Sequence, residues 1–430
     1  MKKTAGIFLL IMFTCMLFAS CESADKNPTK PAPVKQVGTA PDLFDGNVLT
    51  KQLLIEAAEV PDGYLLVNDG HLEGNGIEKY DKFGELLWRK RLPFSPDLDF
   101  SRNSVIIKPL SDGNFVLGYD VYTHQNEDGT WVAYDAVLAK CSKDGNLLWQ
   151  YTFDNFADSI IERIFETDTG NIIIAGSGRE DTEPQIGGLE DIYLFSFSQE
   201  GKLLNSVKYG GSDFDYLQDA EYVSGVGLAA LFTSQSRDGT FSASKDGYGV
   251  DILALIDDLN IKWHRPFGTF MSLDSLIATE EAIYLLDLKN NCYKVDYNGN
   301  TLLNKSIAEK SAFVHYVSNG SNNLVLQVDD KVLFYDNDFN VKRTIDFDAG
   351  DVNKLITTDE GFVIASINIT GQLKSPPIIS SIWCSSEIVY SGYNKSGKLI
   401  WRISHDITPQ GWYDYNSNPS EWDYIRSYPS

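Results

Sequence analysis

Short apolar runs, separated by polar turns that contain glycine, fill the chain from about residue 51 onward. Runs such as 172–175 (Ile-Ile-Ile-Ala) and 251–255 (Asp-Ile-Leu-Ala-Leu) are rich in Ile, Leu and Val and are bounded by Gly, Asn or Asp. This pattern is typical of β-strands, and no stretch after the first twenty residues keeps a helical period for more than a turn or two. Many runs are apolar on both faces, which predicts sheets that are covered on both sides by neighbours.

One phrase recurs along the chain: a turn of the form Asp-x-x-Gly, followed by an apolar strand that often begins Leu-Leu-Trp. The clear copies are at residues 80–92, 142–149 and 394–401, and looser copies are at 198–205, 258–263, 296–303 and 338–343. Three further predicted strands precede each copy, so the unit has four strands and about 40 to 60 residues. Seven such units predict an all-β fold, a seven-bladed β-propeller of four-stranded antiparallel blades.

The propeller is expected over residues 46–407, with short fifth and sixth blades. The first unit starts at its inner strand and the last ends at its outer strand, so a shared closing strand is missing unless residues 34–50 supply it. Residues 408–430 contain two Trp and four Tyr. We expect this C-terminal tail to lie against the ring, over the seam between the first and last blades or over one mouth of the channel.

The recurring phrase Asp-x-x-Gly-x-x-x-Trp resembles the repeats of quinoprotein-dehydrogenase-like (PQQ-like) propellers. It is also similar to repeats of bacterial surface propellers that end Gly-Asn-Leu-Leu-Trp and continue with a Gly-Gly-x-x-x-Asp loop, which residues 209–215 match. The resemblance covers residues 51–405 and implies a fold rather than a function, because the matching residues belong to the scaffold. It implies that four repeat tryptophans dock one blade against the next: Trp88, Trp149, Trp263 and Trp401.

The N-terminus resembles a bacterial lipoprotein signal. Lys2 and Lys3 precede an apolar run at residues 7–18, and small residues lead to Cys21. The resemblance implies that residues 1–20 are removed and that the Cys21 thiol carries lipid such as palmitate; the alternative is an ordinary secretory signal with an incidental cysteine. Glu22 favours the outer membrane of a Gram-negative bacterium by the family's sorting rule, facing either the periplasm or the medium. Residues 21–45 are rich in Pro and predict a flexible to extended stalk.

The net charge limits the classes of partner, and the cysteine content indicates whether disulfides or metal sites are expected. The net charge of −24 argues against nucleic acid and against binding an anionic membrane surface through protein charge. Membrane attachment is therefore expected only through lipid on Cys21. Cys141, Cys292 and Cys384 lie in different repeats and are expected to be buried free thiols rather than disulfides or metal ligands.

Four long spacers between second and third strands are expected on one face, and extra length on one face is where repeat proteins usually place recognition. They lie at residues 121–131, 177–191, 233–251 and 367–387. The candidate ligand-binding residues in or near these spacers are Tyr122, His124, Trp131, Arg179, Asp181, Glu190, Asp215, Arg237, Asp238, Tyr248 and Trp383.

The sequence contains no recognisable motif for a metal site, a cofactor site or a catalytic site. The five histidines lack metal-ligand spacing, and the segments at 336–340 and 414–418 lack the glycine that a calcium loop needs. No phosphate loop, dinucleotide motif or Gly-x-Ser-x-Gly elbow is present, so no cofactor, metal or catalytic residue is predicted. The leading hypothesis is a monomeric, non-enzymatic propeller that binds a protein or glycan. The alternatives are a polysaccharide-acting hydrolase or lyase, a quinone-dependent dehydrogenase, and a relative of the outer-membrane-protein assembly lipoprotein.

Overall fold

The structure is a computed structural model. It describes residues 52–70, 76–91, 100–125, 131–153, 156, 160–179, 190–241, 249–269, 272–307, 316–318, 324–328, 331–346, 351–358, 361–373, 383–394 and 396–406. All of them belong to one compact unit, residues 35–430. The predicted signal peptide, the predicted lipidation site Cys21, the predicted stalk and the C-terminal tail lie outside the described residues. Within the part of the chain that is described, no helix combines the length and apolarity needed to cross a bilayer.

The described strands form seven four-stranded sheets, which we number in chain order. Sheets 1 and 2 contain β1 (Gln52–Val60), β2 (Gly63–Gly70), β3 (Gly76–Asp81), β4 (Leu86–Arg91), β5 (Phe100–Pro109), β6 (Phe115–Gln125), β7 (Trp131–Cys141) and β8 (Leu147–Phe153). Sheets 3 and 4 contain β9 (Arg163–Glu166), β10 (Ile172–Gly178), β11 (Asp191–Phe197), β12 (Leu203–Tyr209), β13 (Asp215–Val223), β14 (Gly227–Ser234), β15 (Val250–Asp257) and β16 (Asn260–Thr269).

Sheets 5 and 6 contain β17 (Leu273–Ala278), β18 (Ile283–Asp287), β19 (Asn291–Val295), β20 (Thr301–Ser306), β21 (Tyr316–Ser318), β22 (Leu324–Val328), β23 (Lys331–Tyr335) and β24 (Val341–Asp346). Sheet 7 contains β25 (Asp351–Thr358), β26 (Gly361–Leu373), β27 (Trp383–Asn394) and β28 (Leu399–Asp406). The single helix among the described residues is the 3-10 turn η1 (Gly239–Phe241).

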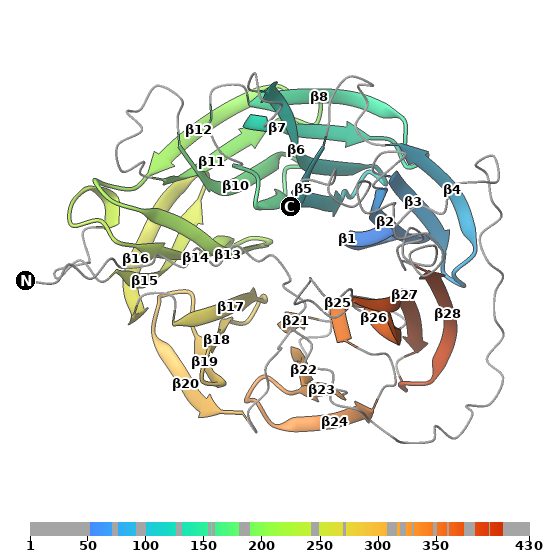
Figure 1. The fold of residues 1–430 in the computed structure, drawn as a ribbon. Coiled ribbons are helices and arrows are strands. Elements are labelled where there is room, and N and C mark those ends of the chain that lie inside the picture. Colours follow the sequence, from blue (N-terminus) through green and yellow to red (C-terminus); the bar gives the residue numbers. More distant parts are fainter. Residues whose placement is uncertain are drawn as a thin grey trace, which may run out of the picture. The chain divides into compact units, whose positions relative to one another are not determined.

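The sheets follow one another around a ring, with the first strand of each sheet innermost and the fourth outermost (Figure 1). Every sheet is an antiparallel meander in chain order, and β1 of the first sheet contacts β25 and β27 of the seventh. The chain is therefore an all-β propeller with four-stranded antiparallel blades, as the repeat predicts. Each sheet is built from four consecutive strands, so among the described residues no strand is shared between the two ends of the chain.

The runs that are apolar on both faces have a direct explanation, because each sheet packs against two neighbours. In β10, Ile172 and Ile174 belong to a hydrophobic cluster with sheet 2, whereas Ile173 and Ala175 belong to a cluster with sheet 4. Six such clusters each join two consecutive sheets. Alternate side chains of one strand therefore stabilise opposite seams of the ring.

The turn between the third and fourth strands needs a left-handed backbone. The glycine of the repeat phrase has φ of 82° at Gly84, 74° at Gly145 and 83° at Gly201. Two looser copies lack the glycine but keep the geometry, with φ of 61° at Leu259 and 55° at Phe339. Their side chains are only 1% and 2% exposed, so hydrophobic burial offsets the local backbone strain.

Three repeat tryptophans pack against the turn glycine of the next sheet, as the repeat resemblance implies. A Cβ atom built on Gly145 would lie 2.9 Å from Cη2 of Trp88, and one on Gly201 would lie 2.5 Å from Cδ2 of Trp149. Trp263 has the same relation to Gly299 at 3.4 Å. The indole nitrogens of Trp149 and Trp263 also donate to backbone carbonyls of the facing turns at 2.8 and 2.9 Å.

Other seams use different side chains for the same contact. The hydroxyl of Tyr209 in β12 donates to the carbonyl of Leu259, and the ammonium of Lys305 in β20 donates to the carbonyl of Phe339 at 2.8 Å. In β24 the side chain of Ile345 packs against Gly397. A fourth-strand side chain thus contacts the third–fourth turn of the following sheet whether or not a tryptophan is present.

Two of the predicted loop spacers are strands instead. β6 runs to Gln125 and pairs with β7 through Tyr122 and Tyr134, and β26 runs to Leu373 and pairs with β27 from Trp383. The expectation of irregular loops at 121–131 and 367–387 is therefore wrong for much of their length. The backbone pairs across the hairpins and continues the ladder beyond the body of the sheet.

The cysteine prediction is confirmed for two of three residues. Cys141 and Cys292 are free, and they are 1% and 0% exposed. Burial raises the pKa of the Cys141 thiol to about 12 and also raises the pKa of the Cys292 thiol. Cys384 lies in β27, and at this position the structure describes the backbone alone.

Candidate recognition face

The connections from second to third strands, and from one sheet to the next, leave an antiparallel meander on the same side. The described residues of this face are densest where sheet 3 passes to sheet 4. Residues 210–216 comprise the β12–β13 link and the first two residues of β13, and residues 235–241 follow β14 and include η1. We call these two segments together the sheet 3/4 corner.

Glycines allow the two segments of the corner to interlock. The Thr240 amide donates to the Gly210 carbonyl at 2.9 Å, and a Cβ atom on Gly211 would lie 2.5 Å from the Asp238 carbonyl oxygen. Gly239 has φ of 70° and approaches Gly210 closely. The Gly-Gly pair of the sequence motif is therefore explained by the close approach of two backbones.

Asp215, the last residue of that motif, holds the corner from inside. Its side chain is buried, and its Oδ2 accepts the Gly211 amide at 2.9 Å and lies 2.7 Å from the Ser236 hydroxyl. Its own amide donates to the Glu190 carbonyl at 2.8 Å. Burial, with a smaller contribution from the charge of Asp191, raises the pKa of Asp215 despite these hydrogen bonds.

The outer surface of the corner is charged and fixed in position. Arg237 and Asp238 are exposed, and Asp238 Oδ1 accepts the Ser212 amide at 2.7 Å. The Asp213 amide donates to the Ser236 hydroxyl at 3.0 Å. Because backbone amides of the loop are bound by side chains, the exposed pair stands on a pre-organised frame.

Two aromatic residues of the corner were not among the predicted site residues. Phe214 and Tyr216 are half-buried and their rings stack, with centroids 5.7 Å apart and planes 6° from parallel. Burial and the nearby carboxylates of Glu190, Asp213 and Asp215 raise the pKa of Tyr216. The alternation of aromatic residues at 214 and 216 is the sequence signal that could have found them.

Some acids that begin third strands are structural. Asp251 is the second residue of β15, the third strand of sheet 4. Its Oδ2 accepts the Ser272 amide at 2.7 Å, the Ser272 hydroxyl at 2.9 Å and the Leu273 amide at 2.9 Å. Its Oδ1 accepts the Thr233 hydroxyl at 2.8 Å. This carboxylate ties one sheet to the start of the next and is unavailable for a ligand.

The structure brings four of the predicted residues together at the corner: Glu190, Asp215, Arg237 and Asp238. Arg179 lies half-buried just after β10. Tyr122 and His124 lie in β6, Trp131 in β7 and Trp383 in β27, and at these four positions only the backbone is described. Asp181 and Tyr248 lie outside the described residues.

Metal chemistry finds no support in the part of the chain that is described, where no group of three or more His, Cys, Asp or Glu side chains could hold an ion. The calcium-like segment at 336–340 is a capped turn. Asp336 Oδ1 accepts the amides of Asn340 at 2.9 Å and Asp338 at 3.1 Å. Hydrogen bonds from Asn340 are the main cause that lowers the pKa of Asp336.

No protein-family model matches the chain, and no curated protein matches it. Among solved structures, the WD40 β-propeller domain of Doa1 has a TM-score of 0.46 at 12% identity and covers 74% of this chain and 90% of its own. BamB from Moraxella catarrhalis has a TM-score of 0.40 at 10% identity, covering 73% and 97%. A protein of unknown function from Bacteroides caccae has 0.33 at 10%, covering 84% and 97%. At these values the similarities carry no functional information.

Proposed function

We propose that this protein is a lipid-anchored, non-enzymatic propeller of the bacterial cell envelope. It binds a protein or glycan through the face that carries the second-to-third strand connections. The observation that carries the proposal is the sheet 3/4 corner, where Arg237 and Asp238 stand exposed on a hydrogen-bonded frame beside the stacked rings of Phe214 and Tyr216. Rigid loops that present charged and aromatic groups lose little conformational entropy on binding.

The anchor rests on the sequence around Cys21. Replacing Cys21 by Ala should abolish acylation and release the protein from the membrane fraction, which metabolic labelling with a palmitate analogue and fractionation would measure. A Cys21→Ala protein that still carries label would contradict lipidation at this residue. Protease treatment of intact cells then distinguishes a surface position, in which the propeller is degraded, from a periplasmic one.

Binding is tested with a double variant and a matched control. Arg237→Ala with Asp238→Ala removes the exposed pair of the corner. Lys143→Ala with Asp144→Ala removes an equally exposed cation–acid pair from the β7–β8 turn on the opposite face. The probes are an array of bacterial glycans and the envelope proteins retained by the immobilised wild type, each measured for Kd.

The corner variant should weaken binding about tenfold or more, because neighbouring recognition contacts are usually worth more than 1.4 kcal/mol together. The opposite-face variant should bind as the wild type does. Equal affinity for all three proteins would show that the corner is not the binding site. Turnover of a glycan on the array would contradict a non-enzymatic role.

A further inference from the structure

The outer edges of the sheets carry positive charge, with one exception. The fourth strand is the outermost of each sheet, so in the described part of the chain no strand pairs with its outer edge (Figure 1). Lys or Arg is present in β4, β12, β16, β20, β24 and β28. β8, with the sequence Leu-Leu-Trp-Gln-Tyr-Thr-Phe, has no charged residue.

The bias toward basic residues on these edges does not follow from composition. The chain has 60 acidic and 36 basic residues, yet the six charged outer strands contain only two acids, Asp346 and Asp406. Charged residues, lysine above all, are a common means by which proteins prevent an exposed edge strand from pairing with another chain. β8 lacks this protection.

The edge of β8 is accessible while one face of the strand is held in place. Leu148 is 52% exposed, and Gln150 and Thr152 are exposed. The alternate side chains face sheet 3, where Trp149 packs on Gly201 and the Tyr151 ring lies 4.9 Å from that of Phe197. The strand is therefore ordered by its own sheet and by its neighbour, and it does not need a partner in order to form.

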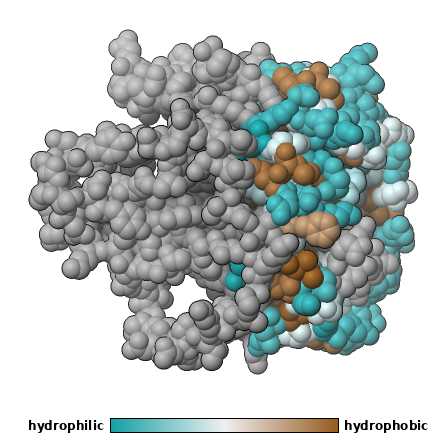
Figure 2. Space-filling view, turned by 90° about the vertical axis from the view of Figure 1, so that its right-hand side faces the viewer, coloured by the Kyte–Doolittle hydropathy of each residue, from teal (hydrophilic) through white to brown (hydrophobic). Residues whose placement is uncertain are grey.

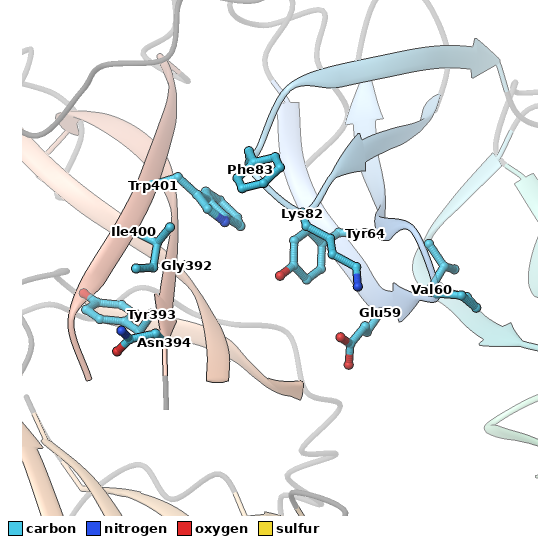
Figure 3. A pocket seen from close by; sticks show the side chains of 11 residues that line it. Glu59, Val60, Tyr64, Lys82, Phe83, Gly392, Tyr393, Asn394, Ile400 and Trp401 are labelled. Atoms are coloured by element: carbon cyan, nitrogen blue, oxygen red, sulfur yellow. The ribbon is translucent and has the colours of Figure 1, made fainter. Parts of the chain in front are cut away.

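Other exposed apolar side chains of the outer wall are interrupted by charge. On the side of the ring that holds β4 and β28, hydrophobic residues stand among hydrophilic ones (Figure 2). Phe83 and Ile400 are 68% and 46% exposed, and they border a pocket that Lys82 and Glu59 also line (Figure 3). β4 and β28 both carry arginine. These edges are less suited to strand pairing than β8.

We propose that β8 pairs with β8 of a second copy of this chain, in place of the monomer expected from the sequence. Around a two-fold axis the same strand of both copies meets, so a Lys or Arg in it lies near like charge. Among the described outer strands, β8 is the one in which this repulsion does not arise. An acidic partner strand would instead favour the six basic edges, so the absence of charge points to self-pairing.

A two-fold axis requires antiparallel pairing, and it joins the two copies of sheet 2 into one continuous sheet. With the axis beside Gln150, this residue lies opposite its own copy, and Trp149 lies opposite Tyr151. Aromatic cross-strand pairs stabilise antiparallel sheets, and Trp, Tyr and Thr favour strands. One strand per partner is a small interface, so we expect a Kd of about 1–100 µM.

The pairing does not depend on the proposed function, but it has a consequence for it. β8 starts at the third–fourth turn, so an antiparallel partner is inverted and the two sheet 3/4 corners of the dimer point to opposite sides. The two inferences can fail separately. Arg237→Ala with Asp238→Ala should leave the dimer unchanged, and a monomeric β8 variant should keep the wild-type Kd of a single corner for its ligand.

The test uses residues 21–430 with Cys21→Ala, which removes the lipidation site. Sedimentation velocity between about 1 and 300 µM, a range that brackets the expected Kd, should show the mass rising to that of a dimer and no further. Gln150→Lys gives β8 the charge that the other outer strands have and should weaken the dimer at least tenfold, because like charges then face each other. Ser206→Lys is the control, since Ser206 is exposed and, like Gln150, lies five residues after its turn glycine.

Mixing charge variants tests whether the two copies of position 150 meet. Gln150→Lys and Gln150→Glu should each be monomeric at 1:1 concentrations where the wild type is dimeric, and their mixture should restore the dimer. Circular dichroism shows that each variant is folded. A wild type that stays monomeric, assemblies that grow beyond two copies, equal weakening by Ser206→Lys, or a mixture that stays monomeric would overturn the proposal.

Discussion

At the scale of single residues, several acidic side chains join neighbouring sheets by accepting hydrogen bonds from backbone amides of the next sheet. On the inner strand β13, Asp219 Oδ2 accepts the Leu276 amide at 2.8 Å, and Glu221 Oε2 accepts the Ala278 amide at 2.7 Å. Both amides belong to β17 of the next sheet. Acidic side chains therefore satisfy backbone donors at the inner edge of the ring.

Glu221 makes stability depend on pH. Burial is the main cause that raises its pKa to about 7, with a further contribution from Asp219, while the Ala278 hydrogen bond and Lys108 act in the opposite direction. A raised carboxyl pKa means that the folded state holds the proton more tightly than the unfolded chain, whose pKa is about 4.3. The stability it contributes is therefore complete below that value and lost as pH rises through about 7.

Glu221→Gln should remove this dependence, because the amide oxygen still accepts the Ala278 hydrogen bond and carries no charge. We expect the variant to match the wild type near pH 4.5 and to exceed it at pH 8 by about 1–2 kcal/mol, a value discounted for partial exposure. Urea unfolding at several pH values measures the difference. Glu85→Gln, at an exposed turn, is the control for loss of one charge, and a pH-independent difference for Glu221→Gln would refute the assignment.

At the scale of elements, consecutive sheets are joined at their outer edge by a contact between the fourth strand of one sheet and the third–fourth turn of the next. Trp149 shows how specific this contact is, since its indole ring lies over Gly201 while its nitrogen donates to the carbonyl of Gln199. The contact needs a residue without a side chain and with a left-handed backbone at the same position, and Gly201 meets both needs with φ of 83°.

Comparing Gly201→Ala with Gly113→Ala separates the effect of the left-handed backbone from the effect of filling the space that Trp149 occupies. Gly113 has φ of 81° and nothing within 4 Å of an added Cβ, so alanine there should cost only the backbone strain of about 1 kcal/mol. At Gly201 the added Cβ also displaces Trp149, and we expect a total of about 2–4 kcal/mol by urea unfolding. In a Trp149→Ala background, the loss of unfolding free energy caused by Gly201→Ala should fall to that caused by Gly113→Ala. Equal losses for the two glycine variants in the wild-type background would refute the packing of Trp149 on Gly201.

Many of the strands, turns and contacts between sheets could be predicted from the sequence, because they depend on residues that are close together in the chain. A turn glycine followed by Leu-Leu-Trp predicts a turn and a fourth strand whose tryptophan packs between sheets, so the contacts of Trp88 and Trp149 could be predicted directly from the sequence. The contact of Trp263 could be predicted only from the looser copy at 258–263, which lacks the glycine. The seam at Tyr209 could not, because its partner is a backbone carbonyl 50 residues away and any hydrogen-bonding side chain can serve. No local pattern encodes that choice.

The buried lysines show the same limit. Lys140 is 4% exposed in β7, and its ammonium pairs with Asp112 at 2.8 Å and contacts Gln199 of the next sheet. Lys79 in β3 pairs with Asp62 at 2.8 Å. A lysine in a strand normally indicates a solvent-facing position, and burial here depends on acceptors from two other turns. The same holds for the candidate site. The Gly-Gly-x-x-x-Asp motif identified Asp215 as a candidate, but the sequence did not predict that its side chain is buried and hydrogen-bonded to the loop.

At the scale of the whole molecule, six hydrophobic clusters of the described residues each join two consecutive sheets, so we expect the sheets to unfold cooperatively. Two native thiols report on distant seams. Cys141 lies in the cluster of sheets 1 and 2, and Cys292 in the cluster of sheets 5 and 6. Burial raises the pKa of both thiols, and a thiol reagent attacks the thiolate, so neither should react in the native ring.

In a chain that starts at residue 22 and carries Cys384→Ser, both thiols should become reactive together as urea approaches the unfolding midpoint. The reason is that separating any two sheets exposes apolar faces on both, which removes the packing that holds the next sheet in place. Labelling rates at each cysteine, resolved by peptide mass spectrometry, measure this directly. A variant weakened at one seam, Trp263→Ala, should shift both rates equally, although that tryptophan belongs to the cluster of sheets 4 and 5. Labelling of one cysteine at a urea concentration that leaves the other protected would show that the sheets open separately, and the ring would then behave as an open array of repeats.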